Sequence, residues 1–302
     1  MTTAAVLGAG GVGGFVAAAL ARSGADVAVV TRPQTAAALG QAGGFAVSSR
    51  ALGEDFRAQP RVATELADPV DVLFVATKAT GLADALERVQ ATPGLVVPLL
   101  NGLEHLEVLR ARFGAEHVAA AVIRIESDRP SAGVIVQTSP GVRVDMAATP
   151  PSPASALGDA AELLRGAGVE ARIGVSEAQV MWSKLARLCA LALTTSASDR
   201  PIGYVRADPR WRSALEGAVS ETVAVANADG AELAAADTLA ELDGAHAELG
   251  SSMQRDIAAG RPTELDAIAG AVVRAGQRHG LRCPTVQWLA ERVAVREARA
   301  VA

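Results

Sequence analysis

The chain has 302 residues, 50% of them hydrophobic, and a formal net charge of −5 at pH 7. At about 100–200 residues per domain, this length predicts two domains, and the composition allows each a substantial core. Charged residues make up 20% of the chain and carry both signs, which excludes a disordered chain and gives no electrostatic footprint for nucleic acid or anionic membranes. Aromatic residues make up only 3%, which argues against base-stacking surfaces.

The spacing of the cysteines and histidines bears on disulfide and metal sites. Cys189 and Cys283 lie far apart in the sequence, and the four histidines have no metal-ligand spacing, so we predict neither a disulfide scaffold nor a metal site. A soluble protein of the reducing cytoplasm is therefore expected. Residues 2–21 carry no charge and resemble a membrane span or signal peptide in length. No basic residue precedes this run and glycines interrupt it, so we predict neither.

The first half of the chain alternates short apolar runs with helix-like segments. The strand-like runs are 4–7, 26–31, 71–76 and 95–99. The helix-like segments are 15–23, 81–90 and 104–113. This alternation predicts βαβ units and a parallel sheet with helices on its faces. Residues 119–125 and 133–137 are two more strand-like runs around a turn-like segment, and they predict a terminal β-hairpin or a mixed-sheet edge.

The second half is helical in pattern, and strand signals end near residue 175. The helical segments are 154–166, 180–196, 211–227, 234–257 and 263–280. We therefore predict an α/β fold, with a Rossmann-like dinucleotide-binding domain over residues 1–174 and a mostly α-helical substrate and catalytic domain over residues 175–302. The apolar helices of the second domain would pair across a homodimer or pack within one chain, and the sequence leaves both open.

A glycine-rich turn follows the first predicted strand and satisfies the pattern G-x-G-x-x-G. Its residues are Gly8, Ala9, Gly10, Gly11, Val12 and Gly13. A strand enters the turn, a helix leaves it and a second strand follows within about thirty residues, which is the context of a dinucleotide-binding site. Gly8 would allow the tight turn, Gly10 the approach of a pyrophosphate and Gly13 close packing of helix on strand. The plainer interpretation is a glycine-rich turn that binds no ligand.

The residues after the second strand select the cofactor. An NAD-preferring site has an acidic residue there to accept a hydrogen bond from the ribose 2′-hydroxyl, whereas this chain has Thr31 and Arg32. A guanidinium binds a 2′-phosphate through two charge-assisted hydrogen bonds, so Arg32 favours NADP(H). The alternative is that Arg32 is an ordinary solvated arginine.

Together these residues resemble the ketopantoate reductase (2-dehydropantoate 2-reductase) family over nearly the whole chain. The matching segments are VLGAGGVGG at 6–14, TR at 31–32, ATKAT at 76–80, LLNGLEHLE at 99–107, WSKL at 182–185 and SSMQRDIAAGRPTELDAIAG at 251–270. The resemblance implies a Rossmann domain, a helical domain and an NADPH-bound cleft between them. It also implies reduction of a branched 2-keto acid to a 2-hydroxy acid in pantothenate biosynthesis.

The resemblance also assigns roles to single residues. Lys78 and Asn101 would lie on loops after sheet strands and contact the cofactor, and Asn101 would also contact the substrate. Lys184 would be the general acid, Glu264 would hold Lys184 or contact the ligands, and Ser252 would bind the substrate carboxylate. Each has a plainer reading: Lys184 as a surface lysine on an amphipathic helix, Glu264 as a first-turn carboxylate that suits the helix dipole, and Ser252 as a surface hydroxyl.

The reaction explains why such groups are needed. Hydride that reaches a ketone carbon leaves negative charge on the oxygen, which must be stabilised and protonated. A lysine ammonium does both, and partial burial moves its pKa from about 10.4 toward neutrality. A protein that only sensed NADPH would not need Lys184 and Glu264, so the two residues favour an enzyme over a binding module.

The sequence departs from the family pattern next to the predicted acid. Asparagines are usual four and eight residues after the lysine, where this chain has Leu188 and Ala192. Without these amides the hydroxyl of ketopantoate lacks partners, so a less polar carbonyl or imine of a specialised pathway is the alternative substrate. Arg124 or Arg187 would then anchor the substrate carboxylate by a bidentate ion pair, although a solvated arginine is the competing interpretation for each.

Overall fold

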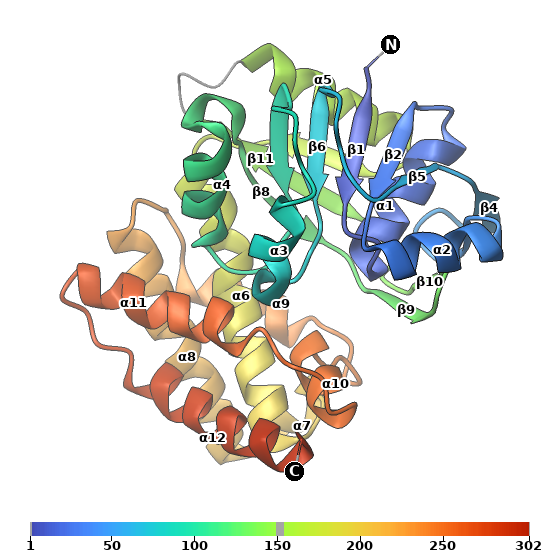
Figure 1. Cartoon of the computed structure of the whole chain (residues 1–302). Helices are drawn as coiled ribbons and strands as arrows, with labels where there is room; N and C mark the ends of the chain where they lie inside the picture. Colours follow the sequence, from blue (N-terminus) through green and yellow to red (C-terminus); the bar gives the residue numbers. More distant parts are fainter. Residues whose placement is uncertain (1, 149–153, 302) are drawn as a thin grey trace. The chain divides into compact units, whose positions relative to one another are not determined.

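The computed structural model describes residues 2–148 and 154–301 and divides into two compact units (Figure 1). The first unit comprises Met1–Leu100 and His105–Val180, and the second comprises Asn101–Glu104 and Met181–Ala302. The division therefore falls six residues after the predicted boundary between residues 174 and 175, within one continuous helix. Within residues 101–104, the side chains of Asn101 and Glu104 bond to residues of the second unit.

A five-stranded parallel sheet forms the centre of the first unit. Its strands, in the order β5-β2-β1-β6-β7, are β5 (Arg61–Ala63), β2 (Val27–Val30), β1 (Ala4–Leu7), β6 (Val72–Val75) and β7 (Leu95–Pro98). Every residue of β1, β2, β6 and β7 is buried. Continuous apolar strands that are buried on both faces are typical of parallel sheets covered by helices, which confirms the predicted Rossmann-like architecture.

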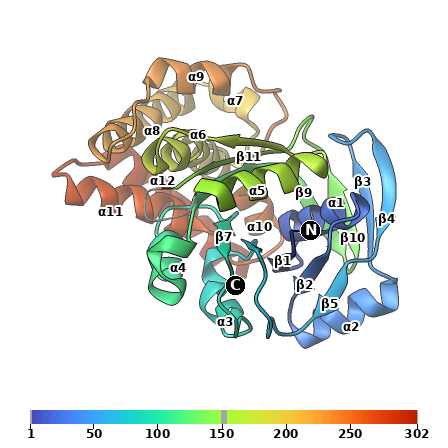
Figure 2. The same ribbon diagram turned by 90° about the horizontal axis from the view of Figure 1, so that it is seen from above.

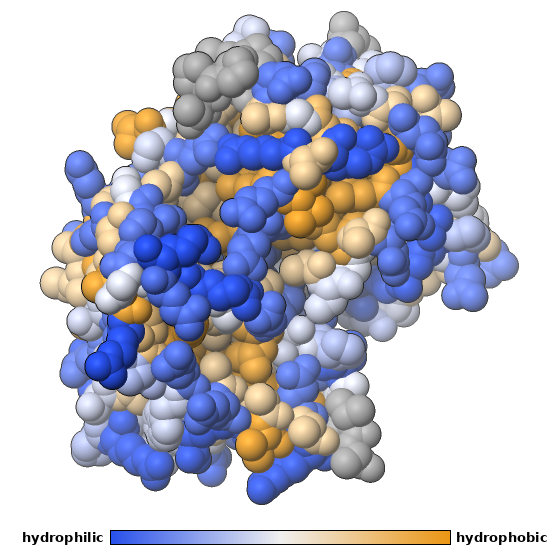
Figure 3. Space-filling view, turned by 60° about the vertical axis from the view of Figure 1, so that its left-hand side comes forward, coloured by the Kyte–Doolittle hydropathy of each residue, from blue (hydrophilic) through white to orange (hydrophobic). Residues whose placement is uncertain are grey.

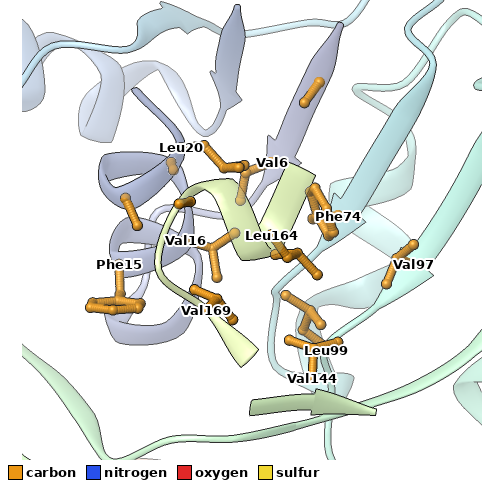
Figure 4. Packing of buried hydrophobic residues seen from close by; sticks show 14 of the residues in the cluster. Val6, Phe15, Val16, Leu20, Phe74, Val97, Leu99, Val144, Leu164 and Val169 are labelled. Carbon is orange, nitrogen blue, oxygen red and sulfur yellow. The ribbon is translucent and has the colours of Figure 1, made fainter. Parts of the chain in front are cut away.

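Helices complete the first unit. They are α1 (Gly11–Arg22), α2 (Pro33–Ala42), the 3₁₀ turn η1 (Ala79–Gly81), α3 (Leu82–Leu86), α4 (His105–Phe113), the 3₁₀ turn η2 (Ala115–His117) and α5 (Ala154–Gly166). Figure 2 shows α1 and α5 on the same side of the parallel sheet. Their side chains meet alternate strand residues in one core, in which Phe15, Leu20, Phe74 and Leu164 are fully buried (Figure 4). Packing in this core sets the position of the first residues of α1 relative to the end of β1.

Two smaller sheets complete the unit and correct one prediction. The first contains β4 (Glu54–Ala58), β3 (Phe45–Ser49), β10 (Val134–Gln137) and β9 (Ser127–Ser131), and the second contains β12 (Glu170–Ile173), β11 (Arg143–Ala147) and β8 (Ala120–Arg124). Of the two alternatives for residues 119–125 and 133–137, the hairpin is wrong, because β8 pairs with β11 while β10 pairs with β9. The mixed-sheet edge is confirmed for β8, the edge strand of a sheet with one antiparallel and one parallel pair. The polar segment that resembled a turn is itself β9, an exposed edge strand, where proline is tolerated.

The second unit is helical, as predicted, and its described residues contain no strand. Its helices are α6 (Glu177–Ser198, which begins in the first unit), α7 (Ile202–Ala207), α8 (Pro209–Ala228), α9 (Ala235–Asp243), α10 (Ser252–Ala258), the π-helix η3 (Asp266–Gly270), α11 (Ala271–Arg278) and α12 (Pro284–Val301). Residues 189–197 of α6 are all buried. A helix that is buried all round lies at the centre of its bundle, so α6 is the central helix of this unit.

Two long helices predicted here are interrupted. The segment 234–257 is not one helix, because α9 ends at Asp243 and α10 begins after Ser251. Ser251 caps α10, since its hydroxyl accepts a hydrogen bond from the amide of Gln254 at 3.1 Å. In the segment 263–280 a π-helical turn precedes α11. Such turns occur often at functional sites.

One face of the molecule carries both hydrophilic and hydrophobic residues at its surface. Figure 3 shows hydrophilic residues over much of the face it draws, with smaller hydrophobic areas among them. Within residues 2–148 and 154–301, no helix combines the length and the apolar character that crossing a membrane requires.

Candidate active site

The turn between β1 and α1 has the geometry predicted from its glycines. Gly8 has φ +108°, and a Cβ there would lie 2.8 Å from the carbonyl oxygen of Ala76. A Cβ on Gly13 would press into the carbonyl oxygen of Gly8, so only glycine lets α1 pack this closely on the strand. A Cβ on Gly10, by contrast, would meet no atom within 4 Å. The space beside Gly10 is open.

The start of α1 offers hydrogen-bond donors to a ligand at that open side. Gly10 is the N-cap and has no side chain to bond the first amides of the helix. The first intrahelical bond is donated by the amide of Gly14 to the carbonyl of Gly10 at 2.8 Å, so the amides of Gly11, Val12 and Gly13 precede it. The helix dipole favours negative charge at this end. The turn therefore fits the pyrophosphate of a dinucleotide.

The second strand ends beside this turn. The amide of Gly8 donates to the carbonyl of Val30, the last residue of β2, at 2.9 Å. Thr31 is buried, whereas Arg32 is exposed and is the N-cap residue of α2. No carboxylate occupies the end of β2, so the position that would bind a ribose 2′-hydroxyl carries a guanidinium instead.

Lys78 lies at the same edge of the sheet. It follows β6, is exposed and precedes the turn η1 as its N-cap. The neighbouring Ala76 and Thr77 pack against Gly8, because their carbonyl and methyl groups are the atoms that a Cβ on Gly8 would contact. The predicted cofactor residues of the first unit therefore gather at the carboxyl ends of β1, β2 and β6, where ligands bind in such sheets.

Three predicted site residues form a hydrogen-bonded chain in the second unit. The ammonium Nζ of Lys184 donates to Oδ1 of Asn101 at 2.8 Å, and Nδ2 of Asn101 donates to Oε2 of Glu264 at 2.8 Å. The three residues are half-buried, and 83 and 163 positions of sequence separate the bonded pairs. An ammonium can only donate and a carboxylate can only accept, so the orientation of the amide between them is determined.

Trp182 anchors α6 two residues before Lys184. The indole is 1% exposed, and its Nε1 donates to Oδ2 of Asp229 at 2.8 Å. Oδ1 of the same carboxylate lies 2.9 Å from Nε2 of His279. Asp229 and His279 follow the last residues of α8 and α11. This contact therefore attaches the segment that carries Lys184 to the ends of two neighbouring helices.

The small number of lysines is a feature of the sequence that a search for motifs does not detect. The sequence contains 28 lysine and arginine residues, of which only Lys78 and Lys184 are lysines. Arginine serves at every other cationic position, in salt bridges and on the surface. Arginine does not lose its proton in proteins, whereas lysine does. Lys78 and Lys184 are therefore the two positions of the sequence at which a side-chain ammonium is present.

Comparison with known proteins identifies the family. The family model described as ketopantoate reductase PanE/ApbA matches residues 4–150, and the model of its C-terminal part matches residues 178–297. The chain belongs to the ketopantoate reductase family. A 2-dehydropantoate 2-reductase of Caulobacter vibrioides is 33% identical over 297 residues, which cover 94% of this chain and 95% of that protein.

Solved structures agree with this assignment. The crystal structure of 2-dehydropantoate 2-reductase from Geobacter metallireducens matches with a TM-score of 0.87 and 26% identity, covering 97% of this chain and 99% of that one. The structure of D-mandelate dehydrogenase with NADH and anilino(oxo)acetate matches with a TM-score of 0.89 over 99% of this chain and 100% of that one. At 20% identity the second likeness shows the fold alone. This ketopantoate reductase family member is thus a dinucleotide-dependent oxidoreductase of C=O and CH–OH groups.

The positions where this family member departs from the pattern lie on α6. Leu188, one turn after Lys184, is half-buried, and Ala192, two turns after it, is 1% exposed. The next turn carries hydroxyls that already have partners: Oγ1 of Thr195 lies 2.7 Å from the carbonyl oxygen of Leu191 in the same helix and 3.0 Å from Oγ of Ser251. The positions four and eight residues after the lysine on α6 are therefore both apolar.

The remaining predicted substrate residues of this family member lie on three different parts of the fold. Ser252 is exposed at the start of α10, while its neighbour Ser251 is the buried cap. Arg124 ends β8 in the first unit, with its Nε 3.8 Å from Asp145. Arg187 on α6 has its Nε 3.7 Å from Glu241 of α9. Both arginines already have carboxylate partners, and their roles toward a substrate stay predictions.

Proposed function

We propose that this protein is an NADPH-dependent reductase that converts a small 2-keto acid to the 2-hydroxy acid, with Lys184 as the proton donor. The Lys184–Asn101–Glu264 chain carries the proposal, because it holds an ammonium in a half-buried, hydrogen-bonded position. The first amides of α1 would hold the pyrophosphate of the cofactor, and Arg32 would hold its 2′-phosphate. When bound, NADPH supplies the hydride.

Each residue of the chain has a distinct part in the proton transfer. As the carbonyl oxygen gains negative charge, the ammonium of Lys184 stabilises it and gives it a proton, which leaves a neutral amine and an alcohol. Asn101 determines the direction of Nζ by accepting one of its hydrogen bonds. The carboxylate of Glu264 polarises the amide and makes its oxygen a stronger acceptor. The amine then takes a proton from water and is ready for the next turnover.

Replacement of Lys184 tests the proton-donor role. Lys184→Ala should lower kcat by roughly 10²–10⁴. Lys184→Arg should be nearly as inactive, because a guanidinium keeps the charge and does not give up its proton. Lys78→Arg is the contrasting variant: Lys78 is a predicted cofactor residue, so its replacement should change KM for NADPH rather than the proton-transfer step. A Lys184→Arg enzyme with the wild-type kcat would remove Lys184 from the proton transfer.

The identity of the substrate needs a panel of 2-keto acids, with loss of NADPH absorbance as the measurement. Leu188 and Ala192 favour a second candidate, a 2-keto acid with an apolar side chain in place of the hydroxylated ketopantoate. Turnover of ketopantoate at the highest kcat/KM would support the first candidate, and turnover of apolar 2-keto acids alone the second. NADPH binding without turnover of any 2-keto acid would point to an imine substrate or a sensor.

Replacement of Arg32 tests the cofactor preference. Arg32→Asp removes a cation and adds a carboxylate that repels the 2′-phosphate and accepts from a ribose hydroxyl, so the ratio of kcat/KM for NADPH to that for NADH should fall. Arg172→Asp is the control, since Arg172 is an exposed arginine of the same unit on β12. An unchanged ratio in Arg32→Asp would contradict the NADPH assignment.

A further inference from the structure

Arg274 of α11 binds two carboxylates at once. Its Nε and Nη2 donate to Oε1 and Oε2 of Glu104 at 2.7 and 2.8 Å. Its Nη1 and Nη2 donate to Oδ1 and Oδ2 of Asp266 at 2.8 and 3.1 Å. These bonds raise the pKa of Arg274, first through Glu104 and then through Asp266, and the bond from Arg274 lowers the pKa of Asp266. Arg274 and Asp266 are therefore both ionised at neutral pH.

The two carboxylates belong to the segments that carry Asn101 and Glu264. Glu104 ends the four-residue segment Asn101–Glu104, which is part of the second unit. Asp266 begins the π-helix η3 two residues after Glu264. The guanidinium of Arg274 thus joins the two segments whose other ends are bonded to each other through the Asn101 amide and the Glu264 carboxylate.

Two glycines make this close approach sterically feasible. Gly102 has φ +92°, and a Cβ there would run into the carbonyl oxygen of Ala267 in η3. A Cβ on Gly270, at the other end of η3, would run into the carboxylate of Asp266 and the guanidinium of Arg274. The backbone of the Asn101 segment therefore packs directly on the π-helix, and Arg274 closes the junction on its far side.

Only arginine can make this junction. Its planar fork presents five donors, enough for two bidentate pairs, whereas a lysine is a point charge with three donors. The side chains of Arg274, Glu104 and Asp266 are 40%, 38% and 83% exposed. Ion pairs this exposed contribute little to folding stability. The effect expected of the junction is therefore on the position of the two segments rather than on whether the unit folds.

We propose that Arg274 is a positioning residue for the reaction: by joining Glu104 to Asp266, it holds Asn101 and Glu264 at the distance at which they orient the ammonium of Lys184. This inference rests on the proposed function of the Lys184 chain. Arg274 itself contacts none of the reacting atoms in this scheme. The fold supplies the junction from three separate segments, which meet at Gly102 and Gly270.

The first test is a split between kcat and KM. Without the guanidinium, Glu104 and Asp266 repel each other and the segments that carry Asn101 and Glu264 move apart. Because a displacement of catalytic groups by about 1 Å is enough to slow a reaction strongly, Arg274→Gln should lower kcat about 10- to 100-fold. The KM for NADPH should stay unchanged. Arg274→Lys should recover part of the loss. Arg212→Gln is the matched control, because Arg212 also joins two carboxylates, Glu216 and Asp243, neither of which adjoins the Lys184 chain.

The second test does not depend on activity. With ¹³C-labelled lysine the protein gives two Cε signals, and Lys78→Arg identifies that of Lys184. Arg274→Gln should move the Lys184 signal and leave the Lys78 signal in place, while Arg212→Gln should move neither. A moved Lys184 signal in a protein that reduces no 2-keto acid would keep the positioning role and overturn the proposed function.

The opposite result separates the two ideas as well. If Lys184→Ala abolishes turnover while Arg274→Gln changes neither kcat nor the Lys184 signal, the proposed function stands and the positioning role is wrong. Equal losses of kcat in Arg274→Gln and Arg212→Gln would also overturn it, because the effect would then follow from any broken arginine junction.

Discussion

The two units build their parts of the candidate site from different materials. In the first unit the turn after β1 is shaped by backbone: one glycine with a positive φ, one that admits a close contact and one beside open space. In the second unit the chain from Lys184 to Glu264 is made of long side chains that come from three segments. A site of the first kind is rigid because its neighbours are packed, and a site of the second kind is rigid only while its hydrogen bonds hold.

This difference sets how each part responds to mutation. An added methyl group in the packed turn forces the backbone apart and costs folding stability, because interiors have few voids to absorb it. A truncated side chain in the polar chain leaves the backbone in place and changes mainly the direction of an ammonium. We therefore expect stability effects in the first unit and rate effects in the second.

The largest effect on folding stability is expected from Gly13→Ala. The new Cβ would press into the carbonyl oxygen of Gly8, which is backbone and cannot move aside, so the junction of β1 and α1 must separate. Overpacking of this kind costs about 1–3 kcal/mol or more. Urea unfolding should show the loss, together with weakened NADPH binding.

Gly40→Ala is the control for that prediction. Gly40 lies within α2, and a Cβ there would meet nothing within 4 Å. Because alanine is a better helix former than glycine, this variant should be as stable as the wild type or more stable by about 0.5–1 kcal/mol. Equal stabilities for the two variants would mean that the turn is not packed as the structure describes.

Next in size is Asn101→Ala. The truncation removes the acceptor of the Lys184 bond and leaves Glu264 without the amide donor, so kcat should fall about 10- to 100-fold while the midpoint of unfolding changes little. Asn227→Ala is a suitable control, because the Asn227 side chain bonds the backbone of Leu233 in the same unit. A loss of stability in Asn101→Ala that exceeds its loss of rate would assign the amide a structural role.

The same contrast explains which features the sequence predicts. The alternation of apolar strands with helices predicts the parallel sheet, because strands buried on both faces leave continuous hydrophobic runs such as Val27–Val30. The glycine turn is predictable because its residues are adjacent in the sequence. The strand Ser127–Ser131 was not predictable from hydrophobic pattern, since an exposed edge strand of polar residues and proline has none.

The Lys184–Asn101–Glu264 chain, in contrast, could not be predicted from the sequence as a bonded unit. The resemblance to the family selects Lys184, Asn101 and Glu264 as separate residues. That the Asn101 amide bridges Lys184 and Glu264 follows only from how the segments pack. The junction at Arg274 had no sequence signal at all, because its partners Glu104 and Asp266 are 170 and 8 positions away. Ion pairs at such separations depend on tertiary structure, which a single sequence does not display.

Gly10→Ala sharpens the comparison within the glycine turn. The open space beside Gly10 admits a Cβ without contact, so the midpoint of unfolding should stay near that of the wild type. The same methyl group would occupy the side from which a pyrophosphate approaches the first amides of α1, so the Kd for NADPH should rise about tenfold. A lower midpoint with an unchanged Kd would contradict the assignment of this space to the cofactor.

The smallest effect concerns a polar contact at the other end of the sheet. The carboxylate of Asp71 accepts hydrogen bonds from the amide and hydroxyl of Thr3 at 2.7 and 2.9 Å, and these bonds, the backbone one first, lower the pKa of Asp71. When the pKa of a carboxyl group is lower in the folded state than in the unfolded state, its ionised form stabilises the fold. Asp71 therefore contributes stability at pH values above its unfolded pKa of about 3.9, and this contribution is lost as the pH falls through the folded pKa.

Asp71→Asn tests this contact, because the amide keeps one acceptor oxygen and removes the charge. At pH 7 the variant should unfold about 1–2 °C below the wild type, since the carboxylate is exposed and solvent screens it. As the pH falls through the lowered pKa, the wild-type carboxyl is protonated and the two melting temperatures should converge. A difference that persists unchanged at the lowest pH at which the protein is folded would show that the contact acts through shape and not through charge.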